Sequence, residues 1–91
     1  MAYKGLDISG RICVVTGGTS GIGRAIALGF AEAGAKVVAG STNPDKVANI
    51  KKELGGANEA VTINVADQKS VQEAMKFAKD KFGRIDVVVN A

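Results

Sequence analysis

The chain has 91 residues, of which 46% are hydrophobic and 23% charged, and its formal net charge is +3. This balance excludes a disordered chain and fits one small globular unit, which buries only about 60–65% of its unfolded surface and is therefore marginally stable. The lysines are dispersed, without an arginine cluster or interleaved aromatic residues, so nucleic-acid binding is disfavoured. No apolar run approaches the roughly 18 residues of a membrane span, and we expect a cytoplasmic protein without membrane contact.

Residues 1–10 are expected to form a short leader, in which Leu6 and Ile8 pack on the edge of a sheet. The apolar run at residues 12–15 predicts the first strand. Cys13 lies within this run and is the only cysteine, and histidine is absent, which excludes an intrachain disulfide and a Cys/His metal site. We expect Cys13 to be a small buried residue, because no imidazole is present to activate its thiol.

A glycine-rich stretch follows this strand and leads into a segment with helical spacing, which predicts a strand, a tight turn and a helix N-terminus. Gly17 would leave the strand with a positive φ, and Gly21 would let the backbone approach a pyrophosphate. Gly23 would let the helix pack closely on the sheet. The unpaired N–H groups and the dipole of the helix start then attract phosphate, although a glycine turn without a ligand is the alternative.

Two other glycine motifs do not fit this stretch. The G-x-G-x-x-G fingerprint fails because Arg24, Ala25 and Ile26 follow Gly23. A P-loop needs Lys and then Ser or Thr after its last glycine, where this chain has Arg24 and Ala25. Phosphoryl transfer is therefore disfavoured.

The first helix is expected over residues 22–33, with Gly34 as its stop. Its predicted inward face consists of Ile22, Ile26, Phe30 and Ala33. The second strand is expected at residues 36–39. It lacks strict alternation, which is typical of a strand buried on both faces of a parallel sheet.

Asn43 and Pro44 form a strong helix start, with a capping side chain followed by proline at the first helical position. The inward face of this second helix is predicted to carry Val47, Ile50 and Leu54. Its charged residues are expected to be solvated, namely Lys46, Lys51, Lys52 and Glu53. Gly55 and Gly56 end the helix.

The third strand is expected at residues 60–64, and Asp67 then caps a third helix that Gly83 stops. The inward face of this helix is predicted to carry Val71, Ala74, Ala78 and Phe82. A fourth strand follows at residues 86–89.

The resulting order, β-α-β-α-β-α-β, predicts an α/β fold of the Rossmann type. Right-handed crossovers give a doubly wound parallel sheet with strand order 3-2-1-4. The winding reverses between the first and fourth strands. Ligands of such sheets bind at this switch point, outside the carboxyl ends of the strands, where the glycine turn of residues 17–23 also lies.

Three motifs resemble those of the short-chain dehydrogenase/reductase family, over about residues 6–91. Residues 16–23, T-G-G-T-S-G-I-G, resemble its T-G-x-x-x-G-I-G signature. Residues 64–67, N-V-A-D, resemble its D/N-V-x-D element, and residues 89–91, V-N-A, resemble the opening of its N-N-A-G or N-A-A-G element. The 3-oxoacyl thioester reductases, including those acting on acyl-carrier protein, and the sugar or polyol dehydrogenases are the most similar members.

The resemblance implies that residues 1–91 are the NAD(P)-binding half of a Rossmann domain that ends after the fourth strand. It implies contacts to the cofactor phosphates and riboses from Gly17, Thr19, Ser20, Gly21, Ile22 and Gly23. It further implies that Asn64 and Val65 contact the adenine and that Asn90 belongs to the site, although a plain turn role for Asn64 is the alternative. The family's catalytic serine and Tyr-x-x-x-Lys pair are not in this sequence, where the one tyrosine, Tyr3, is followed four residues later by Asp7. We therefore expect no activity from these residues alone.

The cofactor preference depends on the end of the second strand. NAD-preferring domains have an acidic residue there that binds the ribose 2′-OH, whereas residues 40–43 read G-S-T-N. Against NADP, Ser20 stands where many NADP-binding relatives have a basic residue. Neutral groups of Ser41, Thr42 and Asn43, with help from Arg24, would bind a 2′-phosphate. We predict NADP, with NAD as the alternative.

These observations predict the cofactor-binding portion of an oxidoreductase. In full-length form it would transfer hydride between a nicotinamide and the carbonyl or secondary alcohol of a small-molecule substrate. The alternatives are a non-catalytic module that binds NADP or ADP-ribose, and a truncated remnant without activity. The last strand would have an unpaired edge, and one face of the first and fourth strands would lack helices, so we also expect self-association or a homo-oligomer.

Overall fold

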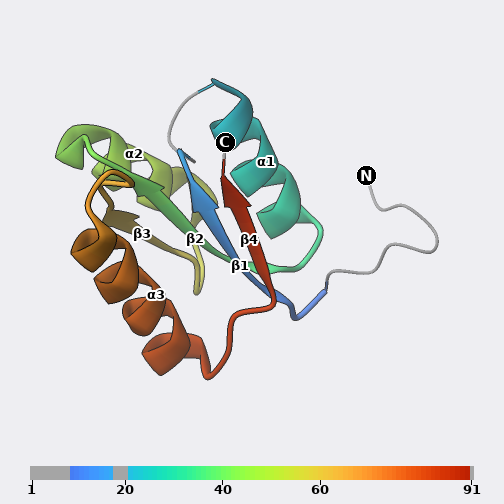
Figure 1. Cartoon of the computed structure of the whole chain (residues 1–91). Helices are drawn as coiled ribbons and strands as arrows, with labels where there is room; N and C mark the ends of the chain where they lie inside the picture. The colour runs from blue at the N-terminus through green and yellow to red at the C-terminus, as the bar shows by residue number, and fades with distance from the viewer. Residues whose placement is uncertain (1–8, 18–20, 91) are drawn as a thin grey trace.

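The computed structural model of the chain describes residues 9–17 and 21–90. In chain order the elements are β1 (Ile12–Thr16), α1 (Gly21–Glu32), β2 (Lys36–Ser41), α2 (Pro44–Leu54), β3 (Glu59–Thr62), α3 (Gln68–Phe82) and β4 (Val87–Asn90). The four strands are parallel in the order β3-β2-β1-β4, with α1 and α2 on one face of the sheet and α3 on the other (Figure 1). The predicted doubly wound α/β fold and its strand order are confirmed.

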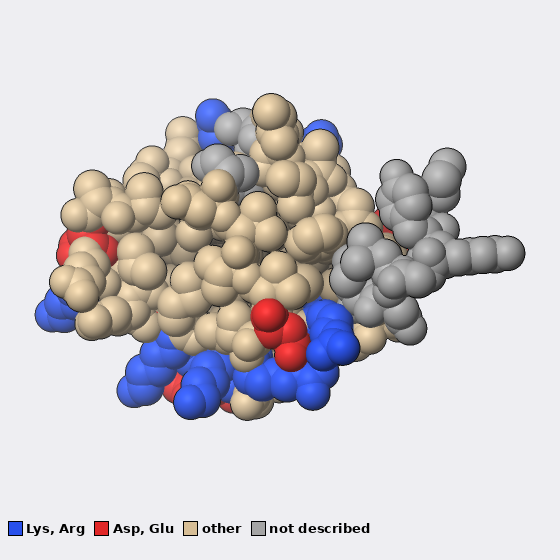
Figure 2. All heavy atoms as spheres, turned by 45° about the vertical axis from the view of Figure 1, so that its right-hand side comes forward, with Lys and Arg blue, Asp and Glu red and all other residues tan. Residues whose placement is uncertain are grey.

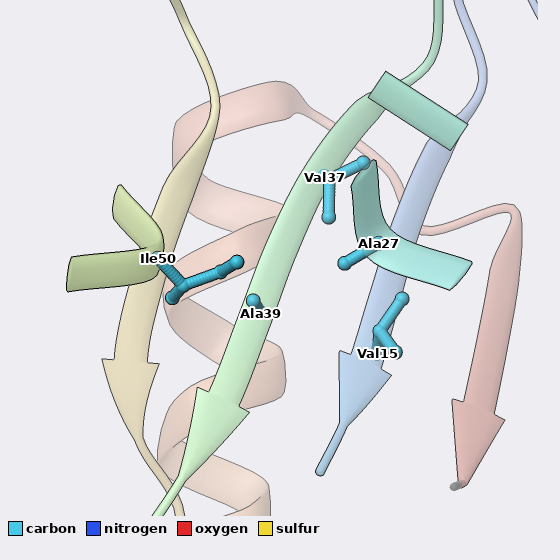
Figure 3. Packing of buried hydrophobic residues seen from close by; sticks show 5 residues of the cluster. All are labelled: Val15, Ala27, Val37, Ala39 and Ile50. Carbon is cyan, nitrogen blue, oxygen red and sulfur yellow. The ribbon is translucent and has the colours of Figure 1, made fainter. Parts of the chain in front are cut away.

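The core between the sheet and the first two helices is made of small and branched residues. Its buried members are Val15, Ala27, Val37, Ala39 and Ile50, each at most 1% exposed (Figure 3). Val15 of β1 lies beside Ala39 of β2 in the parallel register. Both strands are buried along most of their length, as the absence of strict alternation in β2 predicted.

A second cluster packs α3 on the opposite face. Val14, Val38 and Ala78 are fully buried there, with Val61, Met75, Phe82 and Ile85 packed around them. Since β1 is buried on both faces, the expected gap in helical cover does not extend to this strand. It is confined to β4, where Val88 is 53% exposed.

The predicted helix caps are present. The Oδ1 atom of Asn43 accepts hydrogen bonds from the backbone N–H groups of Asp45 at 2.9 Å and Lys46 at 3.3 Å. The Oδ1 atom of Asp67 accepts one from the N–H of Lys69 at 3.0 Å. The predicted stops Gly34, Gly55 and Gly83 all have positive φ. These local signals set the lengths of the helices.

The predicted inward face of α1 is confirmed for Ile26 and Phe30, which pack against the core, and is wrong for Ile22. Ile22 is 77% exposed, and the buried positions are Gly23 and Ala27. These two lie four residues apart and therefore on one side of the helix. The fully buried positions of α1 thus carry only small residues, while the larger side chains of Ile26 and Phe30 are partly buried against the same core.

Some strand bounds differ from the prediction, and the structure contains ion pairs that were not predicted. β2 extends to Ser41, while β3 starts at Glu59 and ends at Thr62. Glu59 lies beside Val38 in the parallel register, and its carboxylate, 13% exposed, pairs with Lys51 at 3.1 Å and with Lys81. Lys51 is exposed as expected and in addition links α2 to β3. Likewise, Glu53 pairs with Arg24 and links α2 to α1.

The amino end of the sheet is held by polar side chains. Asp86, just before β4, accepts a hydrogen bond from the backbone N–H of Ile12 at 2.8 Å and one from Nε of Arg84 at 3.0 Å. Asn58 accepts from the N–H of Val37 at 2.8 Å and donates to the carbonyl oxygens of Leu54 and Gly55. The backbone N–H groups at the starts of β1 and β2 are therefore hydrogen-bonded to the residues that directly precede β4 and β3.

Cys13 is fully buried as predicted, and burial raises the pKa of its thiol. The predicted packing of Leu6 and Ile8 and the placement of Tyr3 lie outside the described residues. Within residues 9–17 and 21–90, no helix is both long and apolar enough to span a bilayer. No three His, Cys, Asp or Glu side chains gather there as a metal site would require.

Candidate functional site

The turn after β1 places glycine where the backbone must bend. Gly17 directly follows β1 with a φ of 72°, and α1 starts at Gly21 with a φ of 58°. A Cβ atom added to Gly21 would meet no described atom within 4 Å, so the backbone there is open to close approach. Thr19 and Ser20, two of the residues expected to contact phosphate, lie outside the described residues.

The N-termini of α2 and α3 are capped by side chains. Asn43 and Asp67 satisfy first-turn N–H groups of α2 and α3. The first turn of α1 holds no acidic residue, and no side chain within the described ranges accepts a hydrogen bond from it. Such a helix start can donate to an anion, with the dipole adding to the attraction. The exposed Ile22 stands in this same turn.

The strands on either side of the switch point are joined by a side-chain hydrogen bond. Thr16 ends β1 directly beside Asn90 at the end of β4. The Thr16 hydroxyl, in a residue only 5% exposed, donates to Oδ1 of Asn90 at 2.8 Å. The oxygen of Asn90 is thus engaged, and its Nδ2 group remains as a donor. The sequence analysis assigned no contact to Thr16. The predicted pairing of the first and fourth strands was the signal that would have indicated its hydrogen bond to Asn90.

Asn64 shapes the corner between β3 and α3. Its Oδ1 atom accepts from the N–H of Ala66 at 3.0 Å, and its carbonyl oxygen accepts from the N–H of Asp67 at 3.0 Å. The turn role that the sequence allowed for Asn64 is therefore present. Val65 lies at the tip of this corner and is 59% exposed.

An open hollow of about 230 Å³ lies between the carboxyl ends of β1 and β4 and the first half of α3. It is lined by Thr16, Val65, Val71, Met75, Val88 and Asn90. Two predicted site residues, Val65 and Asn90, therefore line the same hollow. Its lining is largely apolar, with Thr16 and Asn90 as the polar residues, and such a lining suits the flat face of a heteroaromatic ring. Sequence reasoning assigned Val71 only to the core and missed Met75 and Val88.

The end of β2 carries uncharged polar groups. The Oγ atom of Ser41 accepts from the N–H of Asn43 at 3.2 Å, and Thr42 is exposed. The guanidinium of Arg24 pairs with Glu53 through both Nε and a terminal nitrogen, and the expected help of Arg24 in binding a 2′-phosphate stays a prediction. This hydrogen bonding raises the pKa of Arg24 and directs its charge toward α2.

The comparisons agree with this geometry. A family model described as short chain dehydrogenase matches residues 11–91. The chain belongs to the short-chain dehydrogenase family. The predicted resemblance is therefore confirmed, and with it the oxidoreductase character of the family.

Curated relatives extend the match. A peroxisomal hydratase-dehydrogenase-epimerase of Neurospora crassa is 46% identical over 86 residues, which cover 93% of this chain and 9% of that protein. A 3-oxoacyl-(acyl-carrier-protein) reductase of Thermotoga maritima is 38% identical over 88 residues, covering 93% of this chain and 36% of the reductase. The chain thus spans about a third of the reductase and less than a tenth of the larger protein.

Solved structures show the same arrangement. A 3-ketoacyl-(acyl-carrier-protein) reductase from Brucella melitensis, complexed with NADH, superimposes with a TM-score of 0.85 at 32% identity, over 89% of this chain and 33% of that one. A short-chain dehydrogenase/reductase from Burkholderia phymatum, in complex with NAD, gives 0.86 at 28% identity, over 91% and 31%. Nicotinamide dinucleotides are thus bound by structures that this chain matches.

Proposed function

We propose that this chain binds a nicotinamide dinucleotide at the carboxyl end of its sheet. In a full-length protein it would be the cofactor-binding portion of an oxidoreductase. That protein would transfer hydride between the nicotinamide and a carbonyl or secondary alcohol of a small molecule. One observation carries the proposal: Gly17 and Gly21 with positive φ, the N-terminus of α1 and a largely apolar hollow all lie at the carboxyl end of one sheet.

Each part of the site suits one part of the cofactor. The phosphates and adjoining ribose would contact Gly17, Thr19, Ser20, Gly21, Ile22 and Gly23. The adenosine ribose would lie against Ser41 and Thr42. The adenine would lie at Asn64 and Val65, with Asn90 closing the far side of the hollow.

We propose NADP as the preferred cofactor, recognised through neutral donors. The oxygen of Ser41 already accepts a hydrogen bond, and so does that of Asn43, which leaves an O–H and an NH₂ group as donors. A 2′-phosphate accepts hydrogen bonds only, so donors fit it well. No acidic residue at positions 41–43 would repel it.

The chain itself is proposed to be without turnover, because the 91 residues hold no Tyr-x-x-x-Lys pair. The same observation favours the second candidate, a module that binds NADP or ADP-ribose without catalysis. Both candidates need the same site. They differ in whether a longer polypeptide supplies the catalytic serine and the Tyr-x-x-x-Lys pair.

Calorimetric titration of the folded chain with NADPH, NADH and ADP-ribose tests the proposal. We expect saturable binding of all three, with NADPH tighter than NADH. Folded protein that binds none of them would contradict the proposed site. Tighter binding of NADH would overturn the preference alone, and carbonyl reduction by the pure chain would overturn the absence of turnover.

Self-association is a further part of the proposal. β4 is an edge strand of the described sheet, and Val88 on it is 53% exposed. An uncharged edge of this kind pairs readily with another strand. Sedimentation of the chain over a range of concentrations should show a dimer, and replacing Val88 with lysine should weaken it.

A further inference from the structure

Ser70 makes a hydrogen bond that the function described so far does not use. It stands in the first turn of α3, and its Oγ atom accepts a hydrogen bond from the backbone N–H of Asn64 at 3.0 Å. The two residues are six positions apart. The bond therefore connects the helix to the chain just beyond β3.

This bond completes the fixation of the corner at Asn64. The carbonyl oxygen of Asn64 accepts from the N–H of Asp67, and its Oδ1 accepts from the N–H of Ala66, both at 3.0 Å. All three bonds converge on Asn64 and leave Val65 displayed at the tip, 59% exposed. A corner held in this way does not have to be ordered when a ligand arrives, which favours affinity.

The hydroxyl of Ser70 is not needed to build α3 itself. Asp67 caps the helix through the N–H of Lys69. Within a helix, serine is a weaker former than alanine because its hydroxyl competes for backbone hydrogen bonds. The contact with Asn64 therefore serves the corner rather than the helix.

We propose that Ser70 is a positioning residue that holds Asn64 and Val65 in the conformation that receives the adenine of the cofactor. The proposal rests on the proposed function, because it assigns the adenine to this corner. Ser70 acts only through Asn64.

ADP-ribose affinity of the full chain, measured by calorimetry, tests this role. We expect Ser70→Ala to weaken binding by about three- to tenfold, as the loss of one hydrogen bond would. Ser70→Thr, which keeps the hydroxyl, should stay within about twofold of the unchanged chain. Gln72→Ala on the exposed side of the same helix is the matched control and should have no effect.

A second readout separates positioning from a general structural role. In Ser70→Ala the amide hydrogen of Asn64 should exchange faster with solvent, while the thermal unfolding temperature is unchanged or higher because alanine favours the helix. If this variant does not fold, Ser70→Cys takes its place, since a thiol is a weak acceptor of similar size.

The outcomes are distinct. Binding by Ser70→Ala equal to that of the unchanged chain would overturn the role of Ser70 and leave the proposed function standing. Unchanged protection of the Asn64 amide would overturn it as well. Failure of the folded, unchanged chain to bind ADP-ribose would instead refute the proposed function, and the inference with it.

Discussion

The two ends of the sheet are built with different chemistry. At the amino end, carboxylates hold the chain together: Asp86 bonds the start of β1, and Glu59 draws together α2 and α3 through Lys51 and Lys81. At the carboxyl end, the bond between Thr16 and Asn90 joins uncharged groups. Figure 2 shows many Lys and Arg side chains along the lower side of the molecule, where α3 and the segment leading into β4 lie in Figure 1.

We infer that residues at the amino end contribute mainly to stability and residues at the carboxyl end mainly to ligand binding. Side chains at the amino end accept hydrogen bonds from backbone N–H groups at the starts of β1 and β2. At the carboxyl end, oxygens of Ser41, Asn43, Asn64 and Asn90 are engaged within the protein. The hydroxyl of Ser41 and the amide NH₂ groups of the three asparagines are the donors that these bonds leave for a ligand. Changes at the two ends should therefore have separable effects on folding and on binding.

The largest effect is expected from Gly23→Val at the carboxyl end. Gly23 is buried on the inward side of α1, and a branched side chain would push the helix start away from β1. NADPH binding should fall below detection in calorimetry. Gly29→Val is the matched control, because Gly29 lies in the same helix and a Cβ atom there meets no described atom within 4 Å. Unchanged affinity in a folded Gly23→Val chain would show that the glycine turn is not the site.

Gly40→Ala should cost the most stability. A Cβ atom on this buried glycine of β2 would lie 2.9 Å from Cγ1 of Ile63 and still closer to its Cδ1. Ile63 is only 2% exposed and has little room to move, so we expect a loss of about 1–3 kcal/mol in urea unfolding. Gly29→Ala should instead stabilise the chain by about 0.5–1 kcal/mol. An unchanged free energy of unfolding in Gly40→Ala would mean that the packing around Ile63 is loose.

Asn58→Ala tests the amino end. The change removes three hydrogen bonds and leaves the N–H of Val37 without its partner. We expect unfolding to become easier by roughly 1–2 kcal/mol, because the site is half-buried and water replaces part of the loss. NADPH affinity of the folded fraction should stay within about twofold, since the residue lies at the opposite end from the site. A large loss of affinity would contradict the separation of the two ends.

The smallest effect on stability is expected from lowering the pH. The N–H of Ile12, with Arg84 and Arg11, lowers the pKa of Asp86 below its ordinary 3.8, and Lys81 and Lys51 lower the pKa of Glu59 below its ordinary 4.5. Carboxylates with lowered pKa values stabilise the fold above their unfolded pKa, and this stability is lost as the pH falls through the folded pKa. The urea midpoint should therefore drop between about pH 5 and pH 3. Glu59→Gln should show a shallower drop, and an equal drop in both chains would refute the role of Glu59.

Much of the fold was predictable because its signals are local. Asn43 and Asp67 cap helices through their own side chains, and Gly83 stops one by adopting a conformation that other residues avoid. Handedness of the crossovers then determined the strand order. The positions expected to form the site follow from that order, which brings Val65 and Asn90 to one hollow. Their contacts with a cofactor remain predictions.

The missed features depend on contacts between distant residues. Arg24 and Glu53 are 29 positions apart, and nothing in the local sequence of either predicts their pairing. The placement of Ile22 on the inward face of α1 was wrong because periodicity gives weight to large apolar residues. The buried positions are instead Gly23 and Ala27. Gly23, which the sequence analysis expected to pack on the sheet, already indicated this side.

The most direct test of the central claim is a titration of the isotope-labelled chain with NADPH, followed through the backbone amide signals in two-dimensional NMR. The account predicts shifts at the carboxyl end, at Gly17, Gly21, Ser41, Asn64, Val65 and Asn90. Signals at the amino end, from Ile12, Val37, Glu59 and Asp86, should stay in place. Shifts concentrated at the amino end, or no shifts in a folded chain at saturating NADPH, would contradict it.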